Sequence, residues 1–117
     1  MKDPRLYLLH ITECIRKVED YTSGGKESFL ADTKTQDAVL RNLQTMAEST
    51  QRLPEDLKAM HPDVPWRAIS GFRNLLVHDY LGVSLLTVWD VSQQDLPGLK
   101  KAVEAMLSLP ALPSPEG

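Results

Sequence analysis

The chain centres on an eight-residue stretch, Arg73-Asn74-Leu75-Leu76-Val77-His78-Asp79-Tyr80. It combines three groups that suit phosphodiester chemistry. An arginine holds and neutralises a phosphate with a planar fork of donors. A histidine titrates near neutral pH, so it can give or take a proton. A tyrosine hydroxyl can donate a hydrogen bond or carry a modification. The apolar residues between the arginine and the histidine predict a helix that is anchored in a core.

The spacing within this stretch has a geometric consequence. A helix advances about 100° per residue, so Arg73 and His78 lie about 140° apart on an unbroken helix and cannot face one pocket. Asn74 and His78 are four residues apart and share a face. Either the helix is distorted before His78, or the site is completed from elsewhere. A two-fold homodimer would complete it, because it sets two copies of one motif side by side.

The same residues also fit a purely structural role. A buried arginine or histidine in a helical bundle is often a satisfied polar group, and Asn74 could be an interhelical hydrogen-bonding residue. Short motifs match by chance. The residues alone therefore leave the catalytic and the structural interpretation open.

Length and composition limit the class of protein. A chain of 117 residues is expected to form one domain. Its net charge of −3 argues against a protein that coats nucleic acid, although a nuclease with a small, locally positive cleft is still compatible. No apolar run is long enough for a membrane span, and the N-terminus lacks the apolar region of a signal peptide. With a single cysteine, Cys14, the chain has no internal disulfide, so we expect a cytoplasmic protein.

The first helix is predicted to begin at Asp3-Pro4 and to end at Ser23-Gly24-Gly25. Its apolar residues recur at helical spacing and are Tyr7, Leu8, Ile11, Cys14, Ile15, Val18 and Tyr21. This stripe is interpreted as part of the core or as the seam of a dimer. Cys14 lies on the stripe, which favours a buried, inert thiol over a nucleophile.

A second long helix is predicted from a capping box at Thr33 and Gln36 to about Leu53. Its core stripe is Val39, Leu43, Met46, Thr50 and Leu53. Glu48 lies on the other side of this helix. We interpret it as a solvated surface residue, and the alternative is a carboxylate that reaches a neighbouring active site.

Shorter elements separate the long helices. Lys26 to Ala31 is expected to be a short helical turn anchored by Phe29 and Leu30, and a second short helix follows Pro54. The next long helix starts near Pro65, carries the central stretch and is expected to stop at Gly82.

The last part of the chain begins with Ser84 as an N-cap for a segment from Leu85 to Gln94. Asp95 and Pro97 predict a kink or a fresh start. An amphipathic helix follows, with Leu96, Leu99, Val103 and Met106 as its apolar face. We divide the chain into a helical domain, residues 1–109, and a proline-rich tail, residues 110–117, predicted to be disordered. The fold class is all-α, with four main helices and one or two short ones.

Several kinds of catalytic motif are missing from the sequence. There is no glycine-rich phosphate loop, no set of histidines and cysteines at zinc spacing, and no nucleophile elbow around a serine. If the protein is an enzyme, its chemistry is therefore expected to need no metal and no cofactor, and to depend on Arg73 and His78.

Arg73-Asn74-x-x-x-His78-x-Tyr80 resembles the R-x-x-x-x-H-x-Y signature of HepT-like toxins in the HEPN superfamily. The flanking sequence is similar as well, at Pro65-Trp66, Val88-Trp89 and Leu96-Pro97. The resemblance covers nearly the whole chain apart from the proline-rich tail.

The resemblance implies an all-α HEPN-type bundle that forms a homodimer, with two copies of the motif meeting in a cleft. It implies a metal-independent endoribonuclease that acts as the toxin of a toxin–antitoxin pair, with Arg73 and His78 as catalytic residues. Asn74 and Tyr80 would support them. The antitoxin would be a minimal nucleotidyltransferase of the MNT type, which neutralises related toxins by transferring AMP onto the motif tyrosine, here Tyr80.

The expected reaction is attack by the RNA 2′-OH on the adjacent phosphorus. His78 would serve as general base or acid, Arg73 would stabilise the phosphorane, and Asn74 would orient His78 or the phosphate. The products would be a 2′,3′-cyclic phosphate and a 5′-hydroxyl. The alternative function is a non-catalytic helical binding module that partners a nucleotidyltransferase, because some HEPN proteins bind without cleaving.

Overall fold

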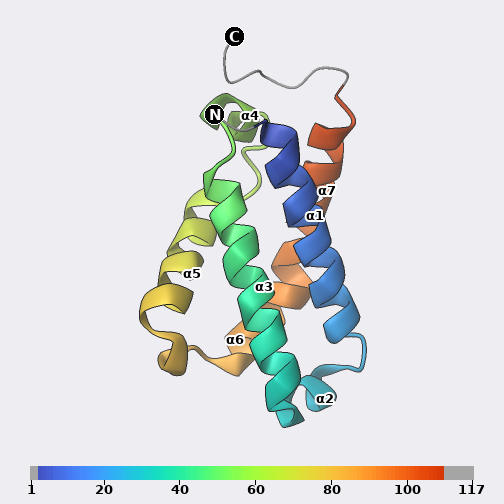
Figure 1. Ribbon diagram of the computed structural model, residues 1–117, viewed down its shortest axis with the longest axis vertical. Coiled ribbons are helices and arrows are strands. Elements are labelled where there is room, and N and C mark those ends of the chain that lie inside the picture. Colours follow the sequence, from blue (N-terminus) through green and yellow to red (C-terminus); the bar gives the residue numbers. More distant parts are fainter. Residues whose placement is uncertain (1–2, 110–117) are drawn as a thin grey trace.

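Four long helices run along the molecule in the computed structural model, which describes residues 3–109 (Figure 1). They are α1 (Pro4–Tyr21), α3 (Thr33–Gln51), α5 (Trp66–His78) and α7 (Leu96–Leu107). The described range contains no strand. The all-α prediction is therefore confirmed, whereas the predicted proline-rich tail lies outside the described residues.

Helices α1 and α3 form the centre of the bundle and pack against each other along their length (Figure 1). The carboxylate of Asp3 accepts a hydrogen bond from the Arg5 N–H and Pro4 opens α1, as the sequence predicts. Within α1, Leu8, Ile11, Ile15 and Val18 are at most 1% exposed. Because this stripe is already covered within one chain, its interpretation as the seam of a dimer is wrong.

The start of α3 differs from the predicted capping box. Asp32, and not Thr33, caps the helix, and its side chain accepts hydrogen bonds from the Lys34 N–H and the Thr35 hydroxyl. An aspartate in extended conformation is a stronger cap than the threonine that follows it. The Gln36 amide instead donates to the Phe29 and Leu30 carbonyls, so it connects α3 to the preceding element. The predicted core stripe of α3 is buried throughout.

The short helix α2 (Lys26–Ala31) closes one end of the bundle. Phe29 anchors it, since its ring is buried and lies 5.7 Å from that of Trp89, measured between centroids. Leu30 is 37% exposed, so its expected role as a second anchor is wrong. Gly25 starts the helix at a φ of 97°, in the left-handed region that favours glycine.

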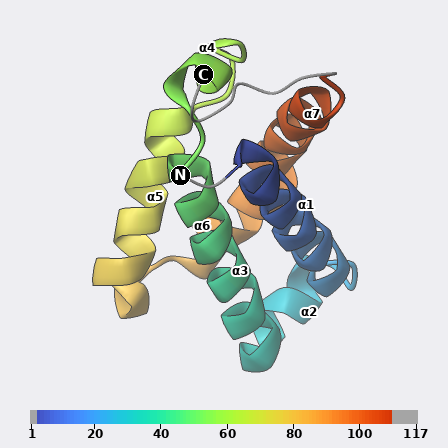
Figure 2. The same cartoon turned by 45° about the horizontal axis from the view of Figure 1, so that its top comes forward.

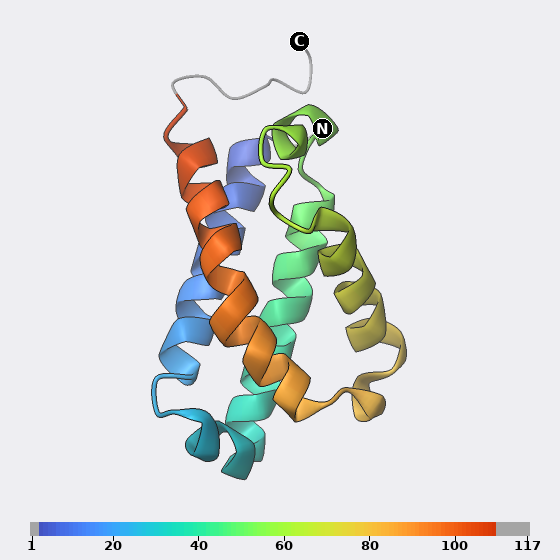
Figure 3. The ribbon, with the colours of Figure 1, turned by 180° about the vertical axis from the view of Figure 1, so that it is seen from behind.

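The C-terminal part forms one helical run that packs on α1 and faces the viewer in Figure 3. Ser84 caps α6 (Leu85–Asp90), a π-helical segment η2 (Val91–Asp95) follows, and α7 continues from it. The predicted kink or fresh start at Asp95 and Pro97 is therefore a local widening and not a break. A proline ring collides with the carbonyl one turn earlier, and the wider π turn provides space for it. The α7 face is buried as predicted.

A small helix, α4 (Glu55–Ala59), and a proline-rich connector lead into α5. The indole N–H of Trp66 donates to the carbonyls of Lys58 and His61, at 3.1 and 3.0 Å. These bonds fix the first residue of α5 to the element before it. The start of α5 is therefore held by polar contacts as well as by packing.

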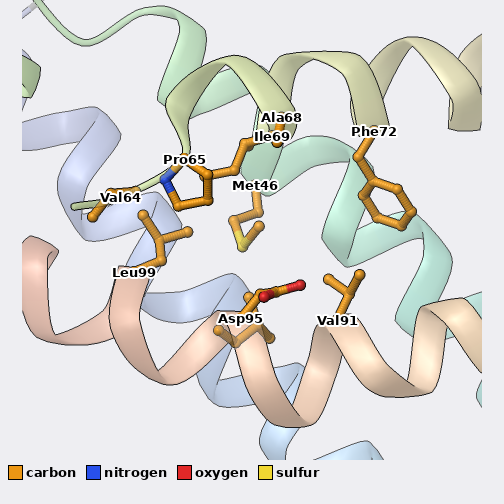
Figure 4. A pocket seen from close by; sticks show the side chains of 10 residues that line it. Met46, Val64, Pro65, Ala68, Ile69, Phe72, Val91, Asp95 and Leu99 are labelled. Carbon is orange, nitrogen blue, oxygen red and sulfur yellow. The ribbon is translucent and has the colours of Figure 1, made fainter. Parts of the chain in front are cut away.

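Helix α5 packs mainly on α3 and stands apart from α7 (Figure 2). Leu76 is its only fully buried residue, whereas Leu75 and Val77 are each 40% exposed. The expectation that all three anchor the central stretch in a core is therefore wrong for two of them. An apolar cleft of about 280 Å³ separates α5 from η2 and α7 (Figure 4). Its walls are Met46, Val64, Pro65, Ala68, Ile69, Phe72, Val91, Asp95, Leu96 and Leu99.

Candidate functional site

Helix α5 is unbroken from Trp66 through Arg73 to His78. The sequence left open whether the helix is distorted between Arg73 and His78 or the site is completed from elsewhere. A continuous helix excludes the distortion. The two side chains therefore leave α5 about 140° apart, and one chain does not bring them into a common pocket.

The helix ends at His78, earlier than the predicted stop at Gly82. Asp79 leaves the helical conformation, with φ −143° and ψ 50°, and a 3₁₀ turn η1 (Tyr80–Gly82) follows. The Asp79 carboxylate folds over Gly82, where an added Cβ would lie 2.5 Å from Asp79 Oδ2. Gly82 therefore permits a close approach inside the turn, and this turn directs Tyr80 away from the axis of α5.

Arg73 lies between α5 and α3. Its Nη2 donates to Glu48 Oε2 at 3.3 Å and its Nη1 donates to Asn74 Oδ1 at 3.1 Å. The side chain is 28% exposed, and its buried Nε has no hydrogen-bond partner among the described residues. A guanidinium carries five N–H donors, so these two bonds orient the group and leave further donors for a ligand.

Glu48 thus contacts the central motif, and its interpretation as a purely solvated surface residue is wrong. Its side chain is 39% exposed and reaches Arg73 from α3. The alternative reading, a carboxylate that reaches a neighbouring candidate site, describes its position. Asn74 was expected to orient His78 or a phosphate, but the structure pairs it with Arg73. His78 is exposed at the end of α5, and its ring makes no hydrogen bond within residues 3–109.

Tyr80 is held by a residue that the sequence interpretation missed. Its hydroxyl donates to Asp37 Oδ1 at 3.0 Å, across 43 positions of sequence. Partial burial, followed by the hydrogen bond and the charge of Asp37, raises the pKa of Tyr80 above its ordinary value. The phenol is therefore neutral at physiological pH and donates its proton to the carboxylate.

A polar stripe on α3 explains how Asp37 and Glu48 both serve the motif. Asp37, Arg41, Gln44 and Glu48 are spaced four, three and four residues apart, so they lie along one face of the helix. Eleven residues at 1.5 Å each separate its ends by about 16 Å. One end of the stripe binds Tyr80 and the other binds Arg73. This spacing was a signal in the sequence that places Asp37 on one polar face with Glu48, but it does not say what that face meets.

A second polar group lies between α1 and α3. His10 Nδ1 is 2.6 Å from Ser49 Oγ, and the Cys14 sulfur is 3.4 Å from His10 Nε2. Cys14 is only 2% exposed, and burial raises the pKa of its thiol. A thiol that is buried and protonated is a poor nucleophile, so the prediction of an inert Cys14 agrees with its surroundings.

Two further kinds of feature are absent from residues 3–109. This range contains no cluster of three or more histidine, cysteine, aspartate or glutamate side chains that could hold a metal ion. None of its helices is both long and apolar enough to cross a membrane. The side chains that remain as candidates for chemistry are those of the central motif and its two partners on α3.

Comparisons with known proteins identify the family of this chain. The family model described as "Ribonuclease HepT-like" matches residues 11–106, which include α5 and the whole motif. A protein of Thermococcus cleftensis named "Probable ribonuclease HepT" is 39% identical over 101 residues, covering 86% of this chain and 92% of its own. The chain belongs to the HepT-like ribonuclease family.

Other relatives support the same assignment. A protein of Caldanaerobacter subterraneus subsp. tengcongensis is 35% identical over 108 residues, covering 92% of this chain and 96% of its own, and bears the name "Putative RNase". A protein of Methanocaldococcus jannaschii with the same description is 35% identical over 107 residues, covering 91% and 88%. No solved structure gives a significant match. Membership in the HepT-like family supports a ribonuclease activity for this chain.

Proposed function

We propose that the protein is a metal-independent endoribonuclease toxin that cleaves RNA with Arg73 and His78 at a dimer cleft. The observation that carries the proposal is the unbroken α5 helix, because it separates the two side chains by about 140° within one chain. A two-fold homodimer supplies the missing partner, since it brings Arg73 of one copy toward His78 of the other.

Exposed apolar residues around His78 support a second copy at this face. Leu75 and Val77 precede His78 in α5, Leu81 lies in η1, and Leu86 is at the start of α6. Leu81 is 97% exposed and Leu86 is 53% exposed. Several large apolar side chains left exposed in one short part of the chain are compatible with an interaction surface. We therefore place the dimer contact at α5, η1 and the start of α6.

The chemistry follows from the two motif side chains. A general base takes the proton of the 2′-OH as its oxygen attacks the adjacent phosphorus, and a general acid protonates the departing 5′-oxygen. His78 is exposed and can fill either role. Arg73 stabilises the charge on the phosphorane, a contribution of about 3–4 kcal/mol for a well-placed donor. The products are a 2′,3′-cyclic phosphate and a 5′-hydroxyl.

Control by a partner is the second part of the proposal. An MNT-type nucleotidyltransferase antitoxin transfers AMP to Tyr80, which is 40% exposed and lies two positions beyond His78. The added phosphate carries a negative charge. It opposes incoming RNA by like-charge repulsion and fills space beside the motif.

Cleavage of RNA by the purified protein in EDTA tests the catalytic proposal. We expect cleavage by the native protein and its loss in Arg73→Ala and in His78→Ala. The two variants should then be unfolded together, refolded as a mixture and assayed again. Mixed dimers combine the Arg73 of one chain with the His78 of the other, so activity should return.

The outcomes separate the two functions that the sequence left open. Recovery in the mixture supports a composite site. If His78→Ala still cleaves while EDTA abolishes cleavage, the metal-independent mechanism is wrong. If the native protein binds but does not cleave RNA under any condition, the non-catalytic helical module that partners a nucleotidyltransferase becomes the better description.

A further inference from the structure

The contact between Tyr80 and Asp37 joins the proposed modification site to a carboxylate on another helix. The phenol donates to Asp37 Oδ1 at 3.0 Å, and both residues are exposed to solvent. Asp37 forms no salt bridge with a basic residue in the described part of the chain. Its carboxylate therefore offers a free negative charge directly to the Tyr80 hydroxyl.

We propose that Asp37 is the general base that accepts the Tyr80 proton during AMP transfer. The inference rests on the proposed function, in which Tyr80 receives AMP from ATP. The protein that is modified thus supplies one catalytic group for its own modification.

Each transfer of AMP forms one bond to phosphorus and breaks another. The Tyr80 phenol oxygen forms a bond to the α-phosphorus of ATP. The bond between that phosphorus and the oxygen bridging to the β-phosphate breaks, and pyrophosphate leaves with the electron pair. The phenol proton passes to Asp37 Oδ1 and then to solvent.

A base is required because the phenol is neutral in the folded protein. Burial and Asp37 raise the pKa of Tyr80, so spontaneous phenolate is scarcer than for a free tyrosine. A carboxylate is a weak base and does not ionise the phenol in advance. As the new bond to phosphorus forms, however, the phenol becomes much more acidic and the transfer to a carboxylate becomes favourable. General base catalysis of this kind typically contributes about 10²–10⁴-fold in rate.

Charged neighbours of Asp37 reduce the repulsion between its carboxylate and an incoming nucleotide. Lys34 and Arg41 lie one helical turn before and after Asp37 on the same face of α3, and both are exposed. On the Tyr80 side, the neighbouring ionisable residues are His78 and Asp79. The Asp79 carboxylate is turned onto Gly82 within the same segment. Asp37 is the charged group that acts on the pKa of Tyr80.

A partner-free measurement tests the contact itself. Alkaline ultraviolet titration of the full chain follows all its tyrosines, and subtraction of the Tyr80→Phe titration isolates Tyr80. We expect Asp37→Asn to lower the midpoint of Tyr80, because the negative charge that opposes phenolate formation is gone. An unchanged midpoint would show that Asp37 does not act on the phenol in solution and would overturn the proposal.

The decisive experiment measures initial rates of AMP addition by intact mass. The full chain is incubated with ATP and an MNT-type nucleotidyltransferase, between pH 6 and 9. Asp37→Asn keeps an oxygen acceptor but loses basicity, and Asp37→Ala loses both. Asp20→Asn, an exposed position on α1, is the matched control.

We expect both Asp37 variants to be modified about 100-fold more slowly than the native protein and the control, within the usual range for general base catalysis. The rate of Asp37→Asn should also rise steeply with pH, because the reaction then depends on free phenolate. Ribonuclease activity before incubation should be the same in Asp20→Asn as in the native protein.

The other outcomes count against the proposal in distinguishable ways. Native rates in Asp37→Asn with slow rates in Asp37→Ala would make Asp37 a positioning residue and overturn its role as base. Native rates in both variants would overturn any role for Asp37, while AMP transfer to Tyr80 would stand. Absence of an adduct on the native protein and the control would overturn the proposed AMP transfer and this inference with it.

Discussion

Arg73 Nη2 lies 3.3 Å from Glu48 Oε2, across the contact between α5 and α3. The two side chains are 28% and 39% exposed, so water screens the pair and its contribution to stability is about 0–1 kcal/mol. Its main effect is on geometry. Together with the bond to Asn74 Oδ1, it fixes the plane of the guanidinium. An arginine that binds a phosphoryl group gains from such fixation, because the cost of orienting it is met before RNA arrives.

Glu48→Gln should separate this positioning role from folding. We expect kcat to fall about tenfold, because Arg73 loses the charge that orients it, and KM for RNA to fall slightly, because a negative charge leaves the phosphate site. The free energy of unfolding should change by less than about 1 kcal/mol. Glu19→Gln, which removes the exposed pair with Lys100, is the control for a lost salt bridge away from the site. If Glu48→Gln and Glu19→Gln have the same kcat, Glu48 does not position Arg73 for catalysis.

Leu81→Glu tests the proposed dimer face. Leu81 is 97% exposed in η1, so a charge there costs nothing in one chain but opposes burial against a second copy. We expect a homodimer for the native protein and a monomer without ribonuclease activity for the variant, by light scattering at micromolar concentration and RNA cleavage. Leu6→Glu, at a 56% exposed position of α1, should remain dimeric and active. A native protein that is monomeric at this concentration would contradict the composite site.

Leu76→Ala should show how α5 is attached to the bundle. Leu76 is 2% exposed and is the only fully buried side chain of α5. We expect a loss of about 2–5 kcal/mol in the free energy of unfolding, the usual range for such a truncation in a core. Leu6→Ala, at an exposed position, should lose much less. Equal losses in chemical denaturation would mean that polar contacts and not Leu76 attach the helix.

Stability should decrease at alkaline pH through Cys14. Burial raises the pKa of its thiol above the ordinary value of 9.0. Below that value the thiol is protonated in both the folded and the unfolded state, so its contribution to the free energy of unfolding is fully present. As the pH rises further, the unfolded thiol releases its proton first, and unfolding becomes more favourable. Denaturation curves between pH 7 and 10 should therefore show a shallower decline for Cys14→Ala than for the native protein. Parallel declines would mean that Cys14 does not contribute.

The sequence by itself determined the helices and their buried faces. Apolar residues at helical spacing identify the core faces of α1, α3 and α7, because a helix in a small bundle must bury one stripe. Strong local signals also placed several ends, such as Asp3-Pro4 and Ser84. Where two neighbouring residues could both start or end a helix, the sequence did not show which one does. Asp32 replaced Thr33 as a cap, and the chain left α5 at Asp79 although Gly82 looked like the stop.

The candidate site was determined only in part. The spacing of Arg73 and His78 showed that an unbroken helix keeps them apart, and α5 is continuous between them in the structure. The residues that contact Arg73 and Tyr80 could not be predicted from spacing. Asp37 and Glu48 lie on one polar stripe of α3, but a stripe alone does not say what it faces.

Only the tertiary structure decided which side chains the stripe meets. Residues 43 positions apart, Asp37 and Tyr80, touch because α3 and α5 pack against each other and the turn after His78 carries the phenol back to α3. Glu48 meets Arg73 through the same alignment. That alignment depends on the burial of Leu76 and on the bonds that hold Trp66 to the residues just before α5. The contacts of Asp37 and Glu48 with α5 and the turn after it, in contrast, span 43 and 25 positions of sequence. Helical periodicity is a local property of the chain, so it predicts the faces of α3 and α5 but not which residues of one lie opposite the other.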